Sequence, residues 1–402
     1  MVIHGTGCCL ADILYARGDF STPAFKRARS RKEGDGGLTP GRLVFAEDFE
    51  RFAGKPYEAA LAEITGGPPD SRNLGGPSAV SLAHAAQVLG DAAEVRYYGM
   101  RGSGEAGDFV EASLARFPFK AFHLMRKEGA EPRTDVISDP RYDNGHGERT
   151  FINLLGAASR FAPEDLDDSF FDAGIVAFGG TALVPLLHDG LTSLLKRAGD
   201  RGAVRVVNLA YDFRSEAAFP GKKWKLGRDD DAYPHIDLLI ADKDEALKTS
   251  GTPGSGEALR WFLAQGVAAV ILTDGSRPVR FAASGKDIFS PVEGRSLPVC
   301  EKINRELAGH PERRGDTTGC GDNFSGGVIA SLAEQLAAAP GGRADLGECA
   351  VQGTAAGGFA CFTLGGAFYE RYPGEKRALL TPYIEACRNQ ASSGTGSLPP
   401  PS

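Results

Sequence analysis

The feature that most constrains the fold of this chain is a repeated alternation between short apolar runs and stretches with helical periodicity. Alternation of this kind requires crossover connections between parallel strands. We therefore expect an α/β fold with a mostly parallel central sheet and helices on both faces, in which ligands bind beyond the carboxyl ends of the strands. The expected strands are residues 2–4, 95–98, 174–178, 204–208, 236–241 and 268–273, and the expected helices are residues 78–89, 109–117, 183–198 and 256–265.

Two regions interrupt this alternation. Residues 18–70 are rich in glycine, proline and charged residues, with no long helical pattern before about residue 57, and residues 119–156 contain short β-like pieces. We expect residues 1–389 to form one domain, in which residues 13–70 and 119–156 build a small β lid. Plain surface insertions explain this composition equally well. The tail, residues 390–402, is rich in Ser, Gly and Pro, which predicts disorder.

The composition narrows the functional classes. A chain of 402 residues with 42% hydrophobic residues can bury a substantial core. A net charge of -7 disfavours nucleic-acid binding, and seven cysteines without a CxxC pair disfavour a zinc site or a disulfide framework. The first residues lack the features of a signal peptide, and no apolar run approaches the roughly 20 residues that cross a bilayer. We expect no membrane association and a cytoplasmic location.

The most specific segment is a glycine-rich loop, Asp-Thr-Thr-Gly-Cys-Gly-Asp, at residues 316–322. An apolar stripe with a spacing of four residues follows it and predicts an amphipathic helix that begins at the loop. Unpaired N–H groups at a helix N-terminus bind anions, and glycine lets a phosphate approach the backbone closely. Asp322 is then placed to accept a proton from an attacking hydroxyl in phosphoryl transfer. The simpler alternative is that Asp322 only caps the helix.

This loop resembles the C-terminal signature of the ribokinase-like (PfkB) carbohydrate kinases, usually Asp-Thr-x-Gly-Ala-Gly-Asp, with Cys320 in place of the alanine. The resemblance implies a ribokinase-like fold and an ATP- and Mg²⁺-dependent kinase that phosphorylates a hydroxyl, typically a primary alcohol, of a small sugar. It assigns the catalytic base to Asp322 and the anion hole to Gly319, Cys320 and Gly321. It also implies that Asp316 could hold a monovalent cation such as K⁺, as in some members.

Two further segments resemble the substrate-binding part of that family. Gly75 and Gly76 open a helix of small residues, as the family's second signature does. Val80 or Ser81, depending on how the segment is aligned, stands where the family has a sugar-contacting Asn, so a polar contact typical of ribokinases is altered. Asp12 resembles the family Asp that accepts hydrogen bonds from two substrate hydroxyls, a role that suits a carboxylate. The alternative for Asp12 is a turn-forming residue.

Segments that resemble the nucleotide-binding part of the family follow in the expected order. Asp242 and Glu245 stand where the family has Asn-x-x-Glu, which organises Mg²⁺ and phosphate, often through water. A solvated charge run at a helix start is the alternative for this pair. The residues expected near ATP are Asn208, Thr273, Gly275, Ser276 and Ala355.

Other functional classes fit parts of the chain. Residues 102–107 match the dinucleotide fingerprint GxGxxG, but the next expected strand lacks the acidic residue that would bind a ribose, which disfavours an NAD-dependent oxidoreductase. A nucleoside kinase, such as an adenosine kinase, is possible on the same fold. A non-catalytic sugar-binding homologue is the third class, although it would need neither Asp322 nor the loop glycines. We expect a small sugar or nucleoside as the partner, and a monomer or a homodimer.

Overall fold

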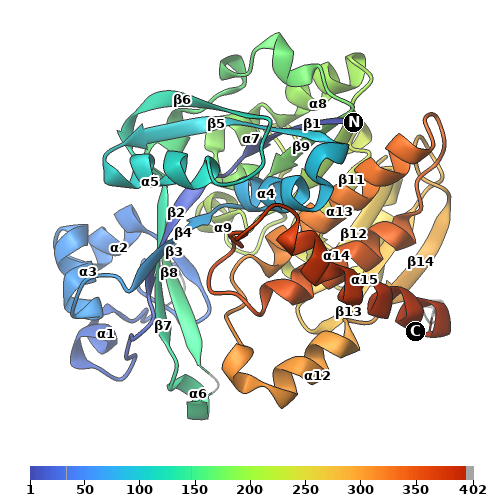
Figure 1. Ribbon diagram of the computed structural model, residues 1–402. Coiled ribbons are helices and arrows are strands. Elements are labelled where there is room, and N and C mark those ends of the chain that lie inside the picture. The colour runs from blue at the N-terminus through green and yellow to red at the C-terminus, as the bar shows by residue number, and fades with distance from the viewer. Residues whose placement is uncertain (33, 146, 395–402) are drawn as a thin grey trace.

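The computed structural model describes residues 1–32, 34–145 and 147–394, and its largest element is a nine-stranded sheet (Figure 1). The strands are β1 (Val2–Gly7), β5 (Glu94–Ser103), β6 (Ala121–Ala130), β9 (Ile175–Gly179), β10 (Val204–Asn208), β11 (Leu238–Asp242), β12 (Ala269–Asp274), β13 (Arg277–Ala283) and β14 (Val292–Leu297). They are ordered β14-β13-β12-β11-β10-β9-β1-β5-β6. The pairs from β12 to β6 are parallel, and β13 and β14 extend one edge antiparallel.

Helices cover both faces of this large sheet. Side chains alternate along its strands, so that Ala269 and Ile271 of β12 face one layer, whereas Val270 and Leu272 face the other. The parallel strands are thus buried on both sides, which explains their continuous apolar runs. The first layer contains α4 (Pro77–Leu89), α5 (Glu105–Leu114), α12 (Glu301–Gly309), α13 (Cys320–Ala338), α14 (Leu346–Ala360) and α15 (Glu375–Gly394); the second contains α7 (Pro185–Asp189), α8 (Leu191–Asp200), α10 (Lys243–Ser250) and α11 (Ser255–Ala264).

A second sheet of five strands, here called the small sheet, follows directly after β1. Its strands are β2 (Leu10–Tyr15), β3 (Leu43–Phe45), β4 (Ser71–Gly75), β7 (Arg133–Asp139) and β8 (Glu148–Leu154), in the order β3-β8-β7-β2-β4. One face packs around Phe25, Phe49, Ile137 and Ile152 against three helices: α1 (Pro23–Ala28), α2 (Ala46–Ala53) and α3 (Tyr57–Thr65). The opposite face, called the inner face below, carries Asp12. The short helix α6 (Tyr142–Gly145) lies between β7 and β8.

The predicted α/β class with a mostly parallel sheet is confirmed, and all six expected strands are present. Three local predictions are wrong. The helix expected at 183–198 is divided into α7 and α8 at Gly190, where a Cβ would lie 2.2 Å from Pro163. The segment 119–156 is divided as well, because β6 belongs to the large sheet rather than to the small one. Helix α15 continues to Gly394, so residues 390–394 are helical, and residues 395–402 lie outside the described part.

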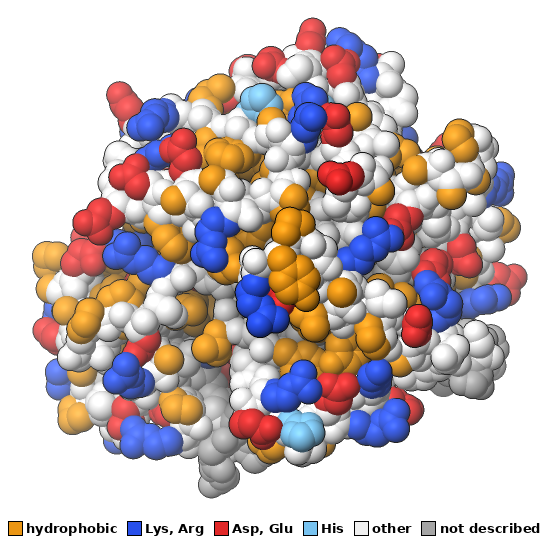
Figure 2. All heavy atoms as spheres, in the orientation of Figure 1, with side chains coloured by type: hydrophobic (Ala, Val, Ile, Leu, Met, Phe, Trp, Pro, Cys, Tyr) orange, Lys and Arg blue, Asp and Glu red, His pale blue; other side chains and the backbone are white. Residues whose placement is uncertain are grey.

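The surface and the cysteines add little that separates functional classes. On the face shown in Figure 2, basic and acidic side chains are interspersed, with apolar side chains between them. No helix in the described part of the chain is long and apolar enough to cross a membrane. All seven cysteines are free thiols, and five of them are buried. The chemistry of the chain therefore has to be sought at the carboxyl ends of the strands.

Candidate active site

The glycine-rich loop 316–322 forms the N-terminus of α13, which begins at Cys320. Gly319 is the N-cap residue and has a φ of 72°. A Cβ on Gly319 would lie 2.4 Å from the Cα of Gly366. The left-handed conformation and the close backbone contact both require glycine at this position.

The backbone donors at this N-terminus are partly free. The N–H of Cys320 donates to the carbonyl of Thr317 at 3.3 Å, whereas the N–H groups of Gly321 and Asp322 have no acceptor among the described residues. Helix α13 has 19 residues, so its dipole adds to the attraction for an anion at this end. Among the N–H groups of this turn, those of Gly321 and Asp322 are therefore free to bind an anion.

Asp322 lies in the first turn of α13 and is half-buried. The helix has no side-chain cap, so the alternative that Asp322 only caps it is wrong. Removal of the carboxyl group from water raises the pKa of Asp322 to about 7. A carboxylate with this pKa, in the same turn as two free N–H groups, is suited to general-base catalysis near neutral pH.

Asp12, on β2, is 6% exposed and forms no hydrogen bond with a described side chain. Burial and then the charges of Asp322 and Asp316 raise the pKa of Asp12 to about 8, against the opposing effect of Arg149. The three carboxyl groups are thus close enough to interact. Asp12 and Asp322 therefore titrate as an interacting pair, and the pKa of each lies above the usual range of an aspartate.

The glycine pair before α4 makes room for Asp12. A Cβ on Gly75 would lie 2.3 Å from Oδ2 of Asp12. Gly76 has a φ of 94°, and a Cβ there would lie 2.6 Å from the carbonyl oxygen of Cys8. The pair therefore allows β4 and α4 to pack closely on the junction between β1 and β2. The structure brings Asp12 and Gly75 together, although they are distant in the sequence.

Arg149, on β8, is a site residue that sequence reasoning missed. Its guanidinium donates to the hydroxyl groups of Thr317 and Thr318, and its Nη1 lies 4.0 Å from Oδ1 of Asp316. It also acts electrostatically on Asp12. A cation from the small sheet therefore contacts the loop that begins α13, and long-range strand pairing rather than a local motif places it there.

Further polar side chains lie beside Asp12 on the inner face. Asn73, Asp12, Thr134 and Asn153 are successive cross-strand partners on β4, β2, β7 and β8, and such partners share one face of a sheet. Nδ2 of Asn153 donates to Oγ1 of Thr134 at 2.9 Å, whereas the buried Oδ1 of Asn153 has no partner in the described part of the chain. The inner face thus offers the Asp12 carboxyl group and one unpaired amide oxygen as acceptors.

Aromatic side chains continue this face. Phe45 of β3 is the cross-strand partner of Asn153, and Phe151 lies on the same face one row further along β8. The ring of Phe45 lies 5.8 Å from that of Phe213, which begins α9 (Phe213–Ala218) after β10. All three aromatic side chains are partly exposed. The inner face is therefore polar near Asp12 and apolar toward β3.

The carboxyl ends of three strands bring most of the expected nucleotide-binding residues to one edge. Asp242 of β11 and Thr273 of β12 are cross-strand neighbours, and Asn208 ends the adjacent strand β10. Gly275 and Ser276 are exposed in the turn after β12. These residues, of which Asn208 and Thr273 are partly exposed, lie at the position that α/β sheets use for ligand binding.

Asp242 and Glu245 fit a water-mediated metal better than a directly bound one. They form a capping box on α10, in which the Glu245 N–H donates to Asp242 at 2.8 Å and the Asp242 N–H donates to Glu245 at 2.9 Å. Burial, and then the charges of Asp242 and Asp322, raise the pKa of Glu245. No group of three or more His, Cys, Asp or Glu in the described part could hold a metal ion. A Mg²⁺ that keeps its water and phosphate ligands suits this pair.

Asp316 is held within the loop structure. Its Oδ1 accepts the N–H of Thr318 at 2.8 Å, and its Oδ2 accepts the N–H of Gly365 at 3.4 Å. The guanidinium of Arg149 supplies a positive charge at 4.0 Å. These contacts hold the loop in place, and the cation role of Asp316 stays a prediction.

Three predicted ligand contacts need correction. Val80, Ser81 and Ala355 are 2%, 3% and 0% exposed, so none of them offers a surface to a ligand. The hydroxyl of Ser81 donates to the carbonyl of Pro77 in its own helix, at 2.6 Å. Ala355 lies in α14, which packs closely against α13. These side chains belong to the helix packing behind the site.

Side chains of the protein occupy the turn at residues 102–107, which resembles a dinucleotide-binding motif. The N–H of Gly102 donates to the buried carboxyl group of Glu131. The guanidinium of Arg101 pairs with Asp108 and Glu111 of α5. A cofactor phosphate would meet an acidic side chain at this turn, which argues against dinucleotide binding.

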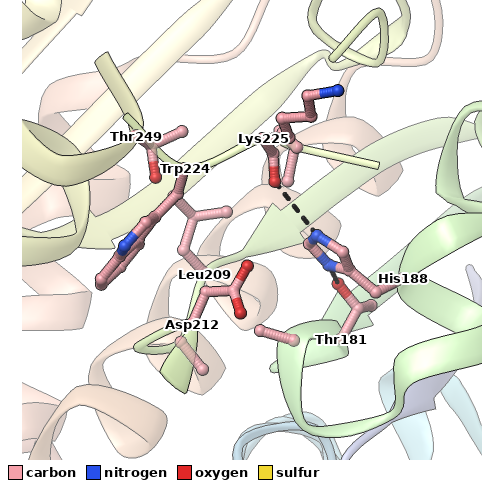
Figure 3. A pocket seen from close by; sticks show the side chains of 10 residues that line it. Thr181, His188, Leu209, Asp212, Trp224, Lys225 and Thr249 are labelled. Atoms are coloured by element: carbon pink, nitrogen blue, oxygen red, sulfur yellow. Dashed lines mark hydrogen bonds between the residues drawn. The ribbon is translucent and has the colours of Figure 1, made fainter. Parts of the chain in front are cut away.

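A small pocket lies beside the ends of β9 and β10 (Figure 3). Hydrogen bonds join its His188 to the hydroxyl of Thr181 at 3.0 Å and to the carbonyl of Lys225 at 3.2 Å. Its Asp212 accepts the N–H of Ser215 and so caps α9. These polar groups already form hydrogen bonds within the protein. We therefore interpret the pocket as part of the packing beside the site.

Comparison with known proteins identifies the family and the fold. The model of the pfkB family of carbohydrate kinases matches residues 71–370. Adenosine kinase from Anopheles gambiae, in complex with a di(adenosine-5) tetraphosphate, is 20% identical and superimposes with a TM-score of 0.66 over 89% of this chain and 95% of that one. A probable sugar kinase from Rhizobium etli gives 17% identity and a TM-score of 0.65, over 95% and 98% of the two chains.

A ribokinase shows the same architecture. The enzyme from Thermotoga maritima is 16% identical and superimposes with a TM-score of 0.61 over 96% of this chain and 99% of that one. At these identities the solved structures establish a ribokinase-like fold. They include both sugar and nucleoside kinases, so the choice of acceptor depends on the residues of this chain.

Proposed function

Because the chain belongs to the pfkB family of carbohydrate kinases, we propose that it transfers the γ-phosphoryl group of ATP to a hydroxyl of a small sugar, with Asp322 as the general base. The observation that carries this proposal is that one helical turn holds both Asp322 and two free N–H groups. Phosphoryl transfer needs a proton acceptor and a site for the charge on the transferred group, and this turn supplies both.

The proposed step follows from these positions. The Asp322 carboxylate takes the hydroxyl proton as the acceptor oxygen attacks the γ-phosphorus, and the bond to the leaving ADP breaks. The N–H groups of Gly321 and Asp322 donate to the oxygens of the group in transfer. Mg²⁺ bound with the nucleotide would neutralise phosphate charge, and Asp242 and Glu245 would hold it through water. The exposed strand edge at Asn208, Thr273 and the following turn would receive the nucleotide.

The acceptor would be held on the inner face of the small sheet. Asp12 and Asn153 supply oxygen acceptors for hydroxyl groups, and the glycine pair leaves space beside Asp12. We propose that residues 1–389 act as one kinase domain with the small sheet as its lid. Arg149 supports this role because it already links the small sheet to the α13 loop. Closing a lid would exclude water and limit hydrolysis of ATP.

A nucleoside is the second candidate acceptor. The observation in its favour is the cluster of partly exposed rings, Phe45, Phe151 and Phe213, on the apolar side of the inner face. A nucleoside would place its ribose hydroxyls at Asp12 and its flat base against these rings. A simple sugar would use only the polar part of the face.

An ADP-release assay with ribose, fructose, adenosine and inosine tests both candidates. We expect ADP release to depend on an acceptor, and a preference for nucleosides would favour the second candidate. Product analysis by mass spectrometry would show the added phosphate. ATP hydrolysis that runs equally fast without any acceptor would contradict both the transfer reaction and the role of the lid.

A further inference from the structure

The amide of Asn323, next to the proposed base, uses all of its hydrogen-bonding capacity. Its Nδ2 donates to the carbonyls of Gly319 at 2.9 Å and Gly366 at 2.8 Å. Its Oδ1 accepts from Nζ of Lys376 at 3.0 Å and lies 2.9 Å from Nδ1 of His84. An amide has two donors and two acceptor sites, and here each is occupied. Asn323 therefore joins the turn that begins α13 to the neighbouring loop at Gly366.

Lys376 determines which way this amide points. In its charged form Lys376 can only donate, and the two glycine carbonyls can only accept, so both favour the orientation in which the oxygen of Asn323 faces Lys376 and the NH₂ group faces the carbonyls. Rotation of the amide by 180° would place NH₂ against Lys376 and oxygen against carbonyl oxygen. Lys376 thus opposes the rotated orientation of the amide, in which the hydrogen bond to the Gly319 carbonyl would be lost.

The burial of Lys376 is costly and therefore informative. It is 1% exposed, and within the described residues its ammonium forms no ion pair. Its ammonium also lies 3.1 Å from Oε1 of Gln87 and 5.9 Å from the ring of Phe368, and the charge of Glu370 acts on it electrostatically. Burial lowers the pKa of Lys376 to about 7. A lysine held in such a place carries a stability cost that packing alone does not explain.

We propose that Lys376 is a positioning residue for phosphoryl transfer, which acts through Asn323 to hold the Gly319 turn under the anion-binding N–H groups. The expected effect on kcat rests on the proposed function, whereas the expected effect on the conformation of the loop does not. Because Gly319 precedes the free donors by two and three residues, a shift of its carbonyl moves them together. Displacement of catalytic groups by about 1 Å can lower a rate by about 100-fold.

The test compares Lys376→Met with Arg377→Met, its neighbour on α15, whose side chain is 56% exposed. We expect K376M to increase amide hydrogen exchange in a peptide that covers residues 316–324 and to lower kcat by about 10- to 100-fold, with little change in the KM of the acceptor. R377M should change neither. A purely structural role would lower the melting temperature and leave kcat per folded molecule unchanged.

A double-mutant cycle with Asn323→Ala tests whether Lys376 acts through Asn323. If it does, K376M should add almost nothing to N323A. The proposal would be overturned if amide hydrogen exchange of the loop were unchanged in K376M. It would also be overturned if the effects of K376M and N323A on kcat were additive in the double variant. Should K376M not fold, N323A alone decides, since it removes the amide and leaves Lys376 bonded to Gln87. If the wild-type protein phosphorylates no acceptor, the proposed function fails, while the exchange measurement still tests the loop.

Discussion

The two halves of the candidate site are built in different ways. The α13 loop uses seven consecutive residues, and its binding groups are backbone donors and one carboxylate. The inner face of the small sheet uses side chains from five strands, including Asp12, Asn153 and Arg149. One half is fixed by local conformation and the other by the pairing of distant segments.

This difference suggests a division of labour. Backbone donors cannot be changed by single substitutions, so the loop half is suited to chemistry that stays the same, such as stabilisation of a phosphoryl group. Side chains on a sheet face can be exchanged one by one, which suits the choice of acceptor. Changes in the loop should therefore act on kcat, and changes on the inner face should act on the KM of the acceptor.

The largest effect is expected for Asp322→Asn. An amide cannot accept the hydroxyl proton, so kcat should fall by about 10³-fold or more while ATP binding is retained. Because the pKa of Asp322 is raised to about 7, wild-type kcat should rise with pH through that value. Steady-state kinetics and calorimetric titration with ATP measure both. Asp108→Asn, in the first turn of α5, is the control, and equal losses in the two variants would contradict the assignment.

The loop half could be predicted from a local pattern, whereas on the inner face only Asp12 and the adjacent glycine pair were expected. Gly319, Gly321 and Asp322 follow one another, so their pattern and the helix after them point to one site without knowledge of the fold. Arg149 contacts Thr318 across 169 residues of sequence, and its own segment carries no motif. Its position depends on the register of β7 and β8, where a slip of one residue would turn every side chain to the other face.

The fold shows the same contrast. Continuous apolar runs predicted the parallel strands because each is buried on both sides. The small sheet is covered by α1 to α3 on one face only, and its strands carry polar residues such as Asn73 and Thr134 on the other. Its strands therefore lack long apolar runs, and the sequence predicted a small β lid in these regions without locating the single strands. The division between α7 and α8 depends on the close contact of Gly190 with Pro163. This contact cannot be recognised from the local sequence.

The second-largest effect is expected for Arg149→Met, which tests whether the halves work separately. Arg149 belongs to the small sheet but contacts the loop, so its loss should lower kcat by about 100-fold, comparable to the loss of a charge-stabilising donor. Arg141→Met is the matched control, since that side chain is 72% exposed beyond β7. A change confined to the KM of the acceptor would show that Arg149 serves recognition alone.

A smaller effect on recognition is expected for Asp12→Asn. The amide keeps one acceptor oxygen but loses the second, so the KM of the acceptor should rise by about 10-fold while the KM of ATP stays within about twofold. Kinetics at varied acceptor and fixed ATP measure this. A fall in kcat as large as that of D322N, with the KM of the acceptor unchanged, would assign Asp12 to the chemistry and break the comparison.

The smallest effect is a change in the pH dependence of stability. The pKa of Asp12 is raised to about 8 in the folded protein, whereas an unfolded chain ionises its Asp near pH 4. Between these values the folded state binds more protons, so the Asp12 contribution lowers the free energy of unfolding as the pH rises. Asp12→Asn removes this loss, so its stability relative to the wild type should rise between pH 5 and pH 8, by at most about 1.4 kcal/mol per pH unit. Urea unfolding at both pH values measures it. An equal difference between the two proteins at pH 5 and pH 8 would show that Asp12 is already ionised in the folded protein at both pH values, and would contradict its raised pKa.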